Sequence, residues 1–283
     1  MTSDDAIKQI AFQGDLGAYS HMSCRAVFPE LEPMPCPSFE EALGAVEGGD
    51  ALYAMIPIEN STAGRVADIH HLLPHSNLYI IAEHFQPVDH CLLALPDATE
   101  ETLSLVKSHP QALQQCRTMI RHLGLEPINY ADTAAAAAHV AEADDATVGA
   151  IASKLAGEVY GLKTLRTNVQ DKGGNTTRFV VLARHPNNAN ELSGPTMTTF
   201  TFEVRNKPAA LFKALGGFAT ESVNMTKLES YQEGDHFIAT MFYADIEGHE
   251  GQANVARAME ELRFHTKRVR IFGTYRQERP RNM

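Results

Sequence analysis

Three polar runs of this chain carry residue types that can do chemistry. Residues 59–62 and 108–115 follow apolar segments, and residues 175–177 come just before the apolar segment that begins at Phe179. Amides, hydroxyls and a carboxylate at the end of a buried strand usually face a ligand, because a hydrophobic core would leave them without partners. The candidate substrate-binding residues are Ser61, Thr62, Gln111, Asn175 and Thr176 in these runs, together with Phe179 just after the third run.

Patterns for metals and nucleotides are weak. His70 and His71 are adjacent and therefore point to different faces of a helix or strand, and the four cysteines have no metal-like spacing. The Gly14-x-x-Gly17 turn is too short for a dinucleotide fingerprint, and the Walker pattern is absent. We expect no metal and no organic cofactor, and four reduced, buried thiols.

The composition is that of an ordinary globular protein with 283 residues, 44% hydrophobic content and a net charge of −11. Such an acidic chain argues against a nucleic-acid partner, which needs a basic surface. No apolar run approaches the roughly 20 residues that span a bilayer, and the start lacks a basic segment before an apolar one. We therefore expect a cytoplasmic protein without a membrane partner.

Strands and helices alternate along the first two thirds of the chain, which indicates an α/β fold with mostly parallel sheets. Ser38-x-x-Glu41 predicts a capping box. The predicted strands are 9–12, 51–58, 78–85, 88–95, 103–107, 127–130, 148–152 and 177–183. The predicted helices include 18–28, 66–73, 111–123 and 133–143. The segment 185–195 is rich in Asn, Pro, Gly and Ser and is predicted to be a linker.

The pattern restarts after the linker. Strands are expected at 197–204, 223–228, 237–245 and 269–275, with one helix starting at Pro208 and another at 254–262. This βαββαβ order is that of the ferredoxin-like fold.

The chain resembles the prephenate dehydratase family. Four ordered motifs carry the resemblance: GDLGAYS at 14–20, PIENS at 57–61, SHPQAL at 108–113 and NTTRF at 175–179. They are far more specific together than any one alone, and the resemblance covers nearly the whole chain.

The resemblance implies a two-lobed catalytic domain, similar to periplasmic binding proteins, over residues 1–185. One lobe would comprise 8–83 plus 168–184, and the other 84–167. A linker at 186–195, an ACT domain at 196–276 and a tail at 277–283 would follow. We expect a monofunctional enzyme, because the chain starts directly at the dehydratase lobe.

The resemblance also implies a lyase of L-phenylalanine biosynthesis. Prephenate would lose its ring hydroxyl as water and its ring carboxylate as CO2, giving phenylpyruvate without a cofactor. Helix N-termini can bind carboxylates through backbone N–H groups. The implied catalytic residues are Thr177, Glu59, Asn60, Ser108 and Gln115.

Thr177 and Glu59 would carry the proton chemistry. We interpret the Thr177 hydroxyl as a positioned donor to the departing hydroxyl, because threonine is a very poor acid in bulk water. The alternative is a structural hydrogen bond at a strand start. Glu59 can act as a general acid if a closed cleft raises its pKa, or as a carboxylate that binds backbone amides at a helix start.

The segments 208–215 and 224–230 resemble an ACT domain, which implies a phenylalanine effector. The implied binding residues are Ala209, Ala210, Leu211, Asn224 and Glu229. Ala209 stands where the family usually has glycine, and Tyr231-Gln232 replace an Arg-Pro pair, so we expect weak inhibition. A single βαββαβ sheet leaves one face and its edges uncovered, which predicts a homodimer or homotetramer paired through this domain.

Two alternatives remain. Arogenate dehydratase is a close variant, in which the substrate side chain bears an ammonium instead of a keto group. A non-catalytic amino-acid sensor belongs to another class, and ultraviolet absorbance after adding prephenate would separate it from the enzyme.

Overall fold

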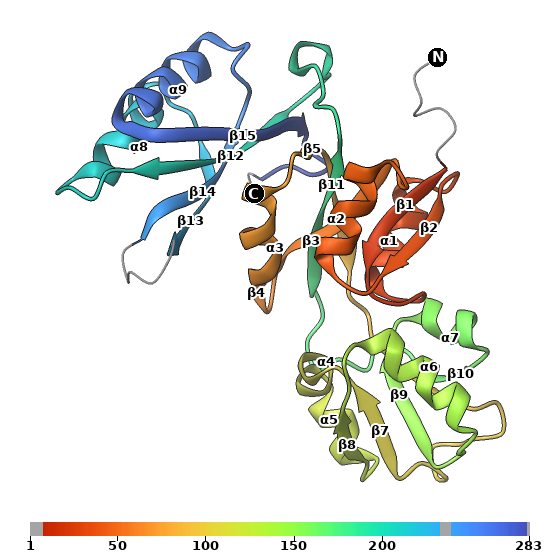
Figure 1. Cartoon of the computed structure of the whole chain (residues 1–283). Helices are drawn as coiled ribbons and strands as arrows, with labels where there is room; N and C mark the ends of the chain where they lie inside the picture. Colours follow the sequence, from red (N-terminus) through yellow and green to blue (C-terminus); the bar gives the residue numbers. More distant parts are fainter. Residues whose placement is uncertain (1–7, 233–238, 282–283) are drawn as a thin grey trace. The chain divides into compact units, whose positions relative to one another are not determined.

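The computed structural model describes residues 8–232 and 239–281. By contacts the chain divides into two compact units, Met1–Leu73 with His84–Val180, and Pro74–Glu83 with Val181–Met283. Two strands, β5 (Tyr79–Pro87) and β11 (Thr176–Ala183), run from one unit into the other (Figure 1). This division follows contacts alone, and the domain and lobe limits given above stay a prediction.

The first sheet has the strand order β2-β1-β3-β11-β5, and β4 pairs with β3. Its strands other than β5 and β11 are β1 (Gln9–Gln13), β2 (Glu32–Cys36), β3 (Tyr53–Asn60) and β4 (Gly64–Arg65). Its helices are α1 (Tyr19–Val27), α2 (Phe39–Gly48) and α3 (Ala67–Leu72), followed by the 3-10 turn Leu73–His75. Both β2 and β3 run parallel to β1, and the last residue of β3 is Asn60, so the strand delivers this amide to the carboxyl edge of the sheet.

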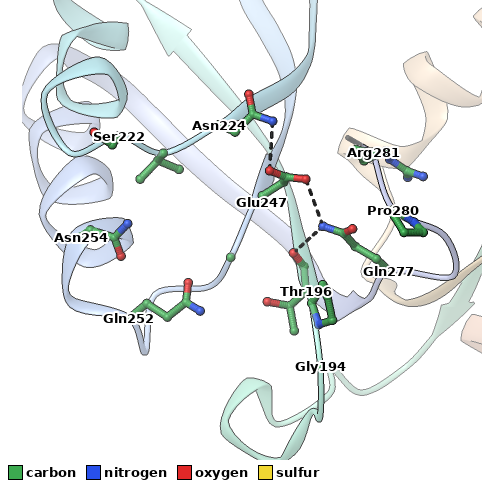
Figure 2. A pocket seen from close by; sticks show the side chains of 13 residues that line it. Gly194, Thr196, Ser222, Asn224, Glu247, Gln252, Asn254, Gln277, Pro280 and Arg281 are labelled. Carbon is green, nitrogen blue, oxygen red and sulfur yellow. Dashed lines mark hydrogen bonds between the residues drawn. The ribbon is translucent and has the colours of Figure 1, made fainter. Parts of the chain in front are cut away.

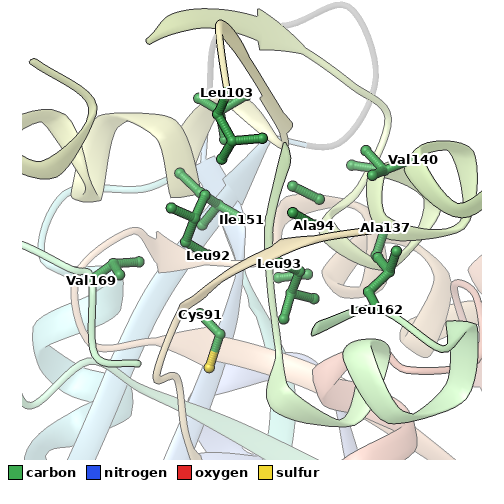
Figure 3. Close-up of a cluster of buried hydrophobic side chains, with 14 of the residues drawn as sticks. Cys91, Leu92, Leu93, Ala94, Leu103, Ala137, Val140, Ile151, Leu162 and Val169 are labelled. Atoms are coloured by element: carbon green, nitrogen blue, oxygen red, sulfur yellow. The ribbon is translucent and has the colours of Figure 1, made fainter. Parts of the chain in front are cut away.

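The second sheet has the order β10-β6-β9-β7-β8. Its strands are β6 (Cys91–Ala94), β7 (Leu105–Ser108), β8 (Glu126–Asn129), β9 (Val148–Ala152) and β10 (Lys163–Arg166). Its helices are α4 (Pro110–Gln115), α5 (Arg117–His122), α6 (Thr133–Ala143) and α7 (Lys154–Tyr160). The buried side chains of β6 and β9 pack against Ala137 and Val140 of α6 to form the core of this lobe (Figure 3).

The C-terminal sheet has the order β13-β14-β12-β15, and its described pairings are antiparallel. Its elements are β12 (Thr196–Val204), α8 (Ala210–Thr220), β13 (Met225–Gln232), β14 (Ala239–Glu247), α9 (Ala253–His265) and β15 (Thr266–Arg276). Both helices lie on one face of the sheet, over Phe200, Phe202 and Phe242 (Figure 1). The prediction of two α/β lobes followed by a ferredoxin-like βαββαβ sheet is confirmed.

The face of this sheet away from the helices is covered by the chain itself. The Arg270 guanidinium on this face donates to the carbonyl of Pro74, at 2.6 Å, and to that of Ser76. The Asn187 amide joins the carbonyls of Ile81 and Thr274, at 2.7 and 3.1 Å. The sequence predicts that a partner copy covers this face, whereas residues 74–83 of the same unit lie against it.

Some elements differ from the predicted ones. The single helix expected at 111–123 is broken at Cys116 into α4 and α5. Asp171 stabilises the break, because its N–H donates to the Gln115 carbonyl at 2.6 Å and its carboxylate accepts the Thr118 N–H at 3.0 Å. Sequence reasoning also missed β10 and the edge strand β2, which contains two prolines.

The strand predicted at 237–245 begins outside the described residues, which resume at Ala239. Among the helices in the described ranges, none is long and apolar enough to cross a membrane.

Candidate active site

A pocket of about 190 Å³ lies in the first unit, where the end of β3, the start of β11 and the helices α1, α4 and α6 converge. It is lined by Tyr19, Asn60, Val88, His90, His109, Gln111, Ala112, Gln115, Asp132, Thr133, Asn175 and Thr177. Five residues that the sequence predicted for the site are in this set. They are Asn60, Gln111, Gln115, Asn175 and Thr177. None of the described lining residues is lysine or arginine, so the pocket offers neutral donors.

The Asn60 amide has a fixed orientation. Its Oδ1 accepts the backbone N–H groups of Thr62 and Ala63 at 3.0 and 2.8 Å, in a turn typical of Asn. Its Nδ2 must therefore donate, and it does so to Asn175 Oδ1 at 2.8 Å and to Thr177 Oγ1 at 2.9 Å.

The Thr177 hydroxyl thus accepts a hydrogen bond from Asn60, which leaves its own hydrogen available. Among the described residues, no acceptor for that hydrogen lies within bonding distance of Oγ1. Because Thr177 lines the pocket, its hydrogen is available to a bound molecule.

Glu59 is not among the lining residues of this pocket, and its role as a general acid stays a prediction. Successive residues of a strand point to opposite faces, so Glu59 lies opposite to Asn60, and Arg178 opposite to Thr177. The Arg178 guanidinium lies 3.9 Å from the Glu59 carboxylate and is almost fully buried, which indicates a structural role for Arg178.

Other predicted residues support the site without lining it. Ser108 is fully buried and donates to the carbonyl of Ile151 at 2.6 Å, which ties β7 to β9, and its catalytic role stays a prediction. Phe179 is 2% exposed and belongs to the core, and its contact with a substrate stays a prediction. Ser61 Oγ accepts the Thr176 N–H at 3.0 Å and so holds the two motif turns together. Thr62 takes part through its backbone N–H.

Sequence reasoning missed Tyr19 and His90. Tyr19 lies in the quoted GDLGAYS motif, but α1 had to be seen to direct its ring to the pocket. His90 precedes the buried strand β6, and a lone histidine at such a place has no distinctive pattern. Burial lowers the pKa of His90, although Gln115 and Asp89 oppose this shift, and burial raises the pKa of Tyr19.

The prephenate dehydratase model matches residues 10–187. The chain belongs to the prephenate dehydratase family. A relative from Komagataeibacter europaeus, described as a bifunctional N-acyl-homoserine lactone acylase/prephenate dehydratase, is 47% identical over 94% of this chain and 95% of its own length. The arogenate dehydratase/prephenate dehydratase 1 of Arabidopsis thaliana is 37% identical over 96% of this chain and 73% of its own.

A solved structure of prephenate dehydratase from Arthrobacter aurescens, in complex with L-Phe, is 28% identical to this chain. It matches with a TM-score of 0.87 over 95% of this chain and 90% of its own length. The predicted lyase function in phenylalanine biosynthesis is confirmed for this chain at the level of the prephenate dehydratase family.

A second pocket, of about 410 Å³, lies in the C-terminal unit of this prephenate dehydratase family member (Figure 2). In its centre the Glu247 carboxylate accepts from Asn224 at 3.0 Å and from Gln277 at 3.4 Å. Of the five predicted phenylalanine-binding residues, only Asn224 lines this pocket. Ala210 and Leu211 pack beside the core, and Glu229 pairs with Lys227 at 3.0 Å. The predicted effector site stays a prediction.

Among residues 8–232 and 239–281, no three His, Cys, Asp or Glu side chains are grouped as metal ligands. The four cysteines, Cys24, Cys36, Cys91 and Cys116, are free and buried.

Proposed function

We propose that this chain converts prephenate into phenylpyruvate, water and CO2 in the pocket around Thr177. The observation that carries this proposal is the orientation of the Asn60 amide, which makes Thr177 Oγ1 an acceptor and frees the hydroxyl hydrogen for the substrate. A dehydration needs a hydrogen-bond donor at the departing hydroxyl, and Thr177 supplies it.

In the reaction, the bond between the ring and its carboxylate breaks and releases CO2. The electron pair enters the ring, which becomes aromatic, and the ring C–O bond breaks. The departing hydroxyl takes one proton, supplied by the solvent, and leaves as water, and Thr177 assists this departure by hydrogen bonding. Aromatisation supplies much of the driving force, so the protein has mainly to bind and orient the substrate.

The two substrate carboxylates would be bound by neutral groups. Gln115 and Gln111 line the pocket and carry amide donors. Arg178 supports β3 and β11 from the opposite side of the strands and does not take part.

The test is the ultraviolet absorbance of phenylpyruvate after prephenate is added, with and without a metal chelator. We expect turnover in both cases. Turnover that disappears with the chelator and returns with a divalent ion would contradict a cofactor-free reaction. Binding of prephenate without turnover would favour the amino-acid sensor.

Arogenate is the alternative substrate, because relatives named for both activities match the chain. The pocket carries an acidic group, Asp132, whose carboxylate caps α6 through the Ala135 N–H at 2.7 Å. The ratio of kcat/KM for prephenate and for arogenate, measured on the same preparation, decides between the two substrates.

A second candidate activity rests on the 47% identical relative whose name includes N-acyl-homoserine lactone acylase. Amide hydrolysis needs a general base, and His90 is the neutral imidazole of the pocket with the lowered pKa. Both of its ring nitrogens already have partners, which favours the dehydration. Release of homoserine lactone from an N-acyl substrate would establish the second activity.

For the whole protein we propose a cytoplasmic homodimer or homotetramer that phenylalanine inhibits weakly. The four free thiols fit the cytoplasm. Strand β13 is an edge of its sheet, and its side chain Leu228 is 40% exposed, which supports pairing there. Phe212 on α8 is 80% exposed and is a further apolar side chain that a partner could cover. The phenylalanine complex of a 28% identical relative supports the effector. Phenylalanine titrated against activity and in a calorimeter tests this, and no effect in either would leave the domain as an assembly module.

A further inference from the structure

A network of hydrogen bonds links Asn60 to Asn175 and Asn175 to Gln115. Asn175 Oδ1 accepts from Asn60 at 2.8 Å, so the other half of the Asn175 amide, Nδ2, must donate. It donates to Gln115 Oε1 at 3.1 Å. The orientation that two backbone N–H groups impose on Asn60 is therefore transmitted to Gln115.

Gln115 Oε1 also lies 3.1 Å from His90 Nε2. Since Oε1 is an acceptor only, His90 must carry a hydrogen on Nε2. Two donors then hold the oxygen of Gln115, and its NH2 group is left over. Among the described residues, that NH2 group has no acceptor, and Gln115 lines the pocket.

Tyr19 contacts the other ring nitrogen of His90, Nδ1. Its hydroxyl lies 2.9 Å from His90 Nδ1 and 2.8 Å from the carbonyl of Asp89, and it has one hydrogen to give. With a neutral ring, the hydroxyl donates to Nδ1. With a charged ring, Nδ1–H donates to the Tyr19 oxygen and the hydroxyl turns to Asp89. Both states keep a hydrogen on Nε2, facing Gln115.

The surroundings keep His90 neutral and Tyr19 protonated. His90 is 3% exposed, and burial lowers its pKa against the opposing influence of Gln115 and Asp89. Burial raises the pKa of Tyr19, and Cys91, Asp89 and Cys116 act in the same direction. Cys91 lies on β6, Asp89 comes shortly before this strand, and Cys116 lies at the α4–α5 break.

We propose that Tyr19 and His90 are positioning residues, which hold the Gln115 amide with its NH2 group turned into the pocket to bind a carboxylate of the substrate. The Asn175 amide and the Nε2–H of His90 together hold the Gln115 oxygen, and Tyr19 supports this form of the ring by donating to Nδ1. Neither residue needs to touch the reacting atoms. The carboxylate part of this inference rests on the proposed dehydratase function, whereas the ring and amide orientations do not.

The first test is the tautomer of His90, read from long-range 15N–1H NMR at about pH 8, well above the ordinary histidine value. The signals are assigned by their loss in His90→Gln. We expect hydrogen on Nε2 and none on Nδ1. Hydrogen on Nδ1 would direct the Nε2 lone pair at Gln115, reverse its amide and overturn the proposal. This measurement needs no turnover, so it stands even if the enzyme assay fails.

The second test uses two replacements of His90. The amide of His90→Gln can put a donor near the place of Nε2, while that of His90→Asn lies near the place of Nδ1. We expect His90→Asn to raise KM for prephenate by roughly 10- to 100-fold with a smaller change in kcat, and His90→Gln to restore most of the loss. An equal increase of KM in both variants, with unchanged folding, would show that His90 only fills space in the core and does not position Gln115.

A double-variant cycle separates positioning from a general structural role. If His90 acts through Gln115, His90→Asn combined with Gln115→Ala should be no worse than Gln115→Ala alone. Multiplying losses would overturn the proposal.

Tyr19→Phe should raise KM in the same sense and lower the pKa of His90 further, because the charged ring loses its acceptor. The matched control is Tyr130→Phe, a half-buried tyrosine outside the pocket, which should leave KM unchanged.

Discussion

At the scale of single residues, the hydroxyl of Thr177 is the group on which turnover should depend most. Thr177→Val keeps the shape and removes the donor, and we expect it to reduce kcat by about 10²- to 10⁴-fold, the usual scale of assistance to proton transfer. The melting temperature should change little, because the hydroxyl makes one hydrogen bond in the protein. Thr164→Val on β10 is the control. Near-normal turnover of Thr177→Val, or loss through unfolding, would disprove the role.

Ala209 carries backbone strain that a smaller residue would relieve. It precedes α8 with φ of 60° in the left-handed region, where a Cβ is unfavourable. We expect Ala209→Gly to raise the free energy of unfolding by about 0.5–1 kcal/mol, measured by urea denaturation. Ala219→Gly inside the same helix should lower the free energy by a similar amount, and a destabilised Ala209→Gly would contradict the strain.

His21 and His90 should make stability fall on the acidic side of neutrality. Burial lowers both pKa values, with Arg25 contributing at His21, so the unfolded chain takes up protons first as the pH drops. Their contribution is complete above the ordinary histidine value of about 6.5 and is lost as the pH falls below it. Burial also raises the pKa of Asp15, so this residue changes the stability with pH in the opposite sense. It does so only at the lower pH values at which aspartate titrates.

Melting temperatures between about pH 8 and pH 5.5 check this, because that window contains the ordinary histidine value. His90→Gln should flatten the profile, while the exposed His122→Gln should not. A profile that is equally steep in both variants would assign the effect to other groups.

At the scale of elements, the loop before α1 is fitted tightly to α7. Ser153 Oγ donates to the Gly17 carbonyl at 2.5 Å, and a Cβ on Gly17 would lie 2.7 Å from the Ala156 Cα. Backbone cannot yield as a side chain can, so this close approach requires glycine.

We expect Gly17→Ala to lower the free energy of unfolding by about 1–3 kcal/mol more than Gly161→Ala does. Gly161 is the control because it also has a positive φ, of 68°, yet has open space beside it. Urea denaturation of the two variants measures the difference. Equal losses would mean that the left-handed backbone, and not the contact with α7, accounts for the effect.

Much of the element order could be predicted from the sequence because local signals agreed with the tertiary structure. Helix α6 starts after its Asp132 cap and runs over Thr133–Ala143 as predicted. The break at Cys116 could not be predicted, since it is stabilised by Asp171, more than fifty residues away in the chain. For the site, the motifs located Asn60, Gln115 and Thr177, but only the strand geometry shows which side chains face the pocket.

At the scale of the whole molecule, assembly should depend on the edge strand β13. Leu228 is 40% exposed there, and a lysine at an edge opposes pairing with another strand. We expect Leu228→Lys to reduce the mass measured by light scattering, whereas Val159→Lys, which changes a 37% exposed residue of α7, should not. A wild-type protein that is monomeric at assay concentrations would contradict the proposed pairing.

The continuity of β5 and β11 across the two units limits how modular this protein can be. A domain joined by one linker can be exchanged between relatives at a single junction. Here the C-terminal unit also contains residues 74–83, which come from the middle of the N-terminal part and contact Arg270 and Asn187. A functional chimaera therefore needs two matched junctions, and recombination within such a gene should preserve the two segments together.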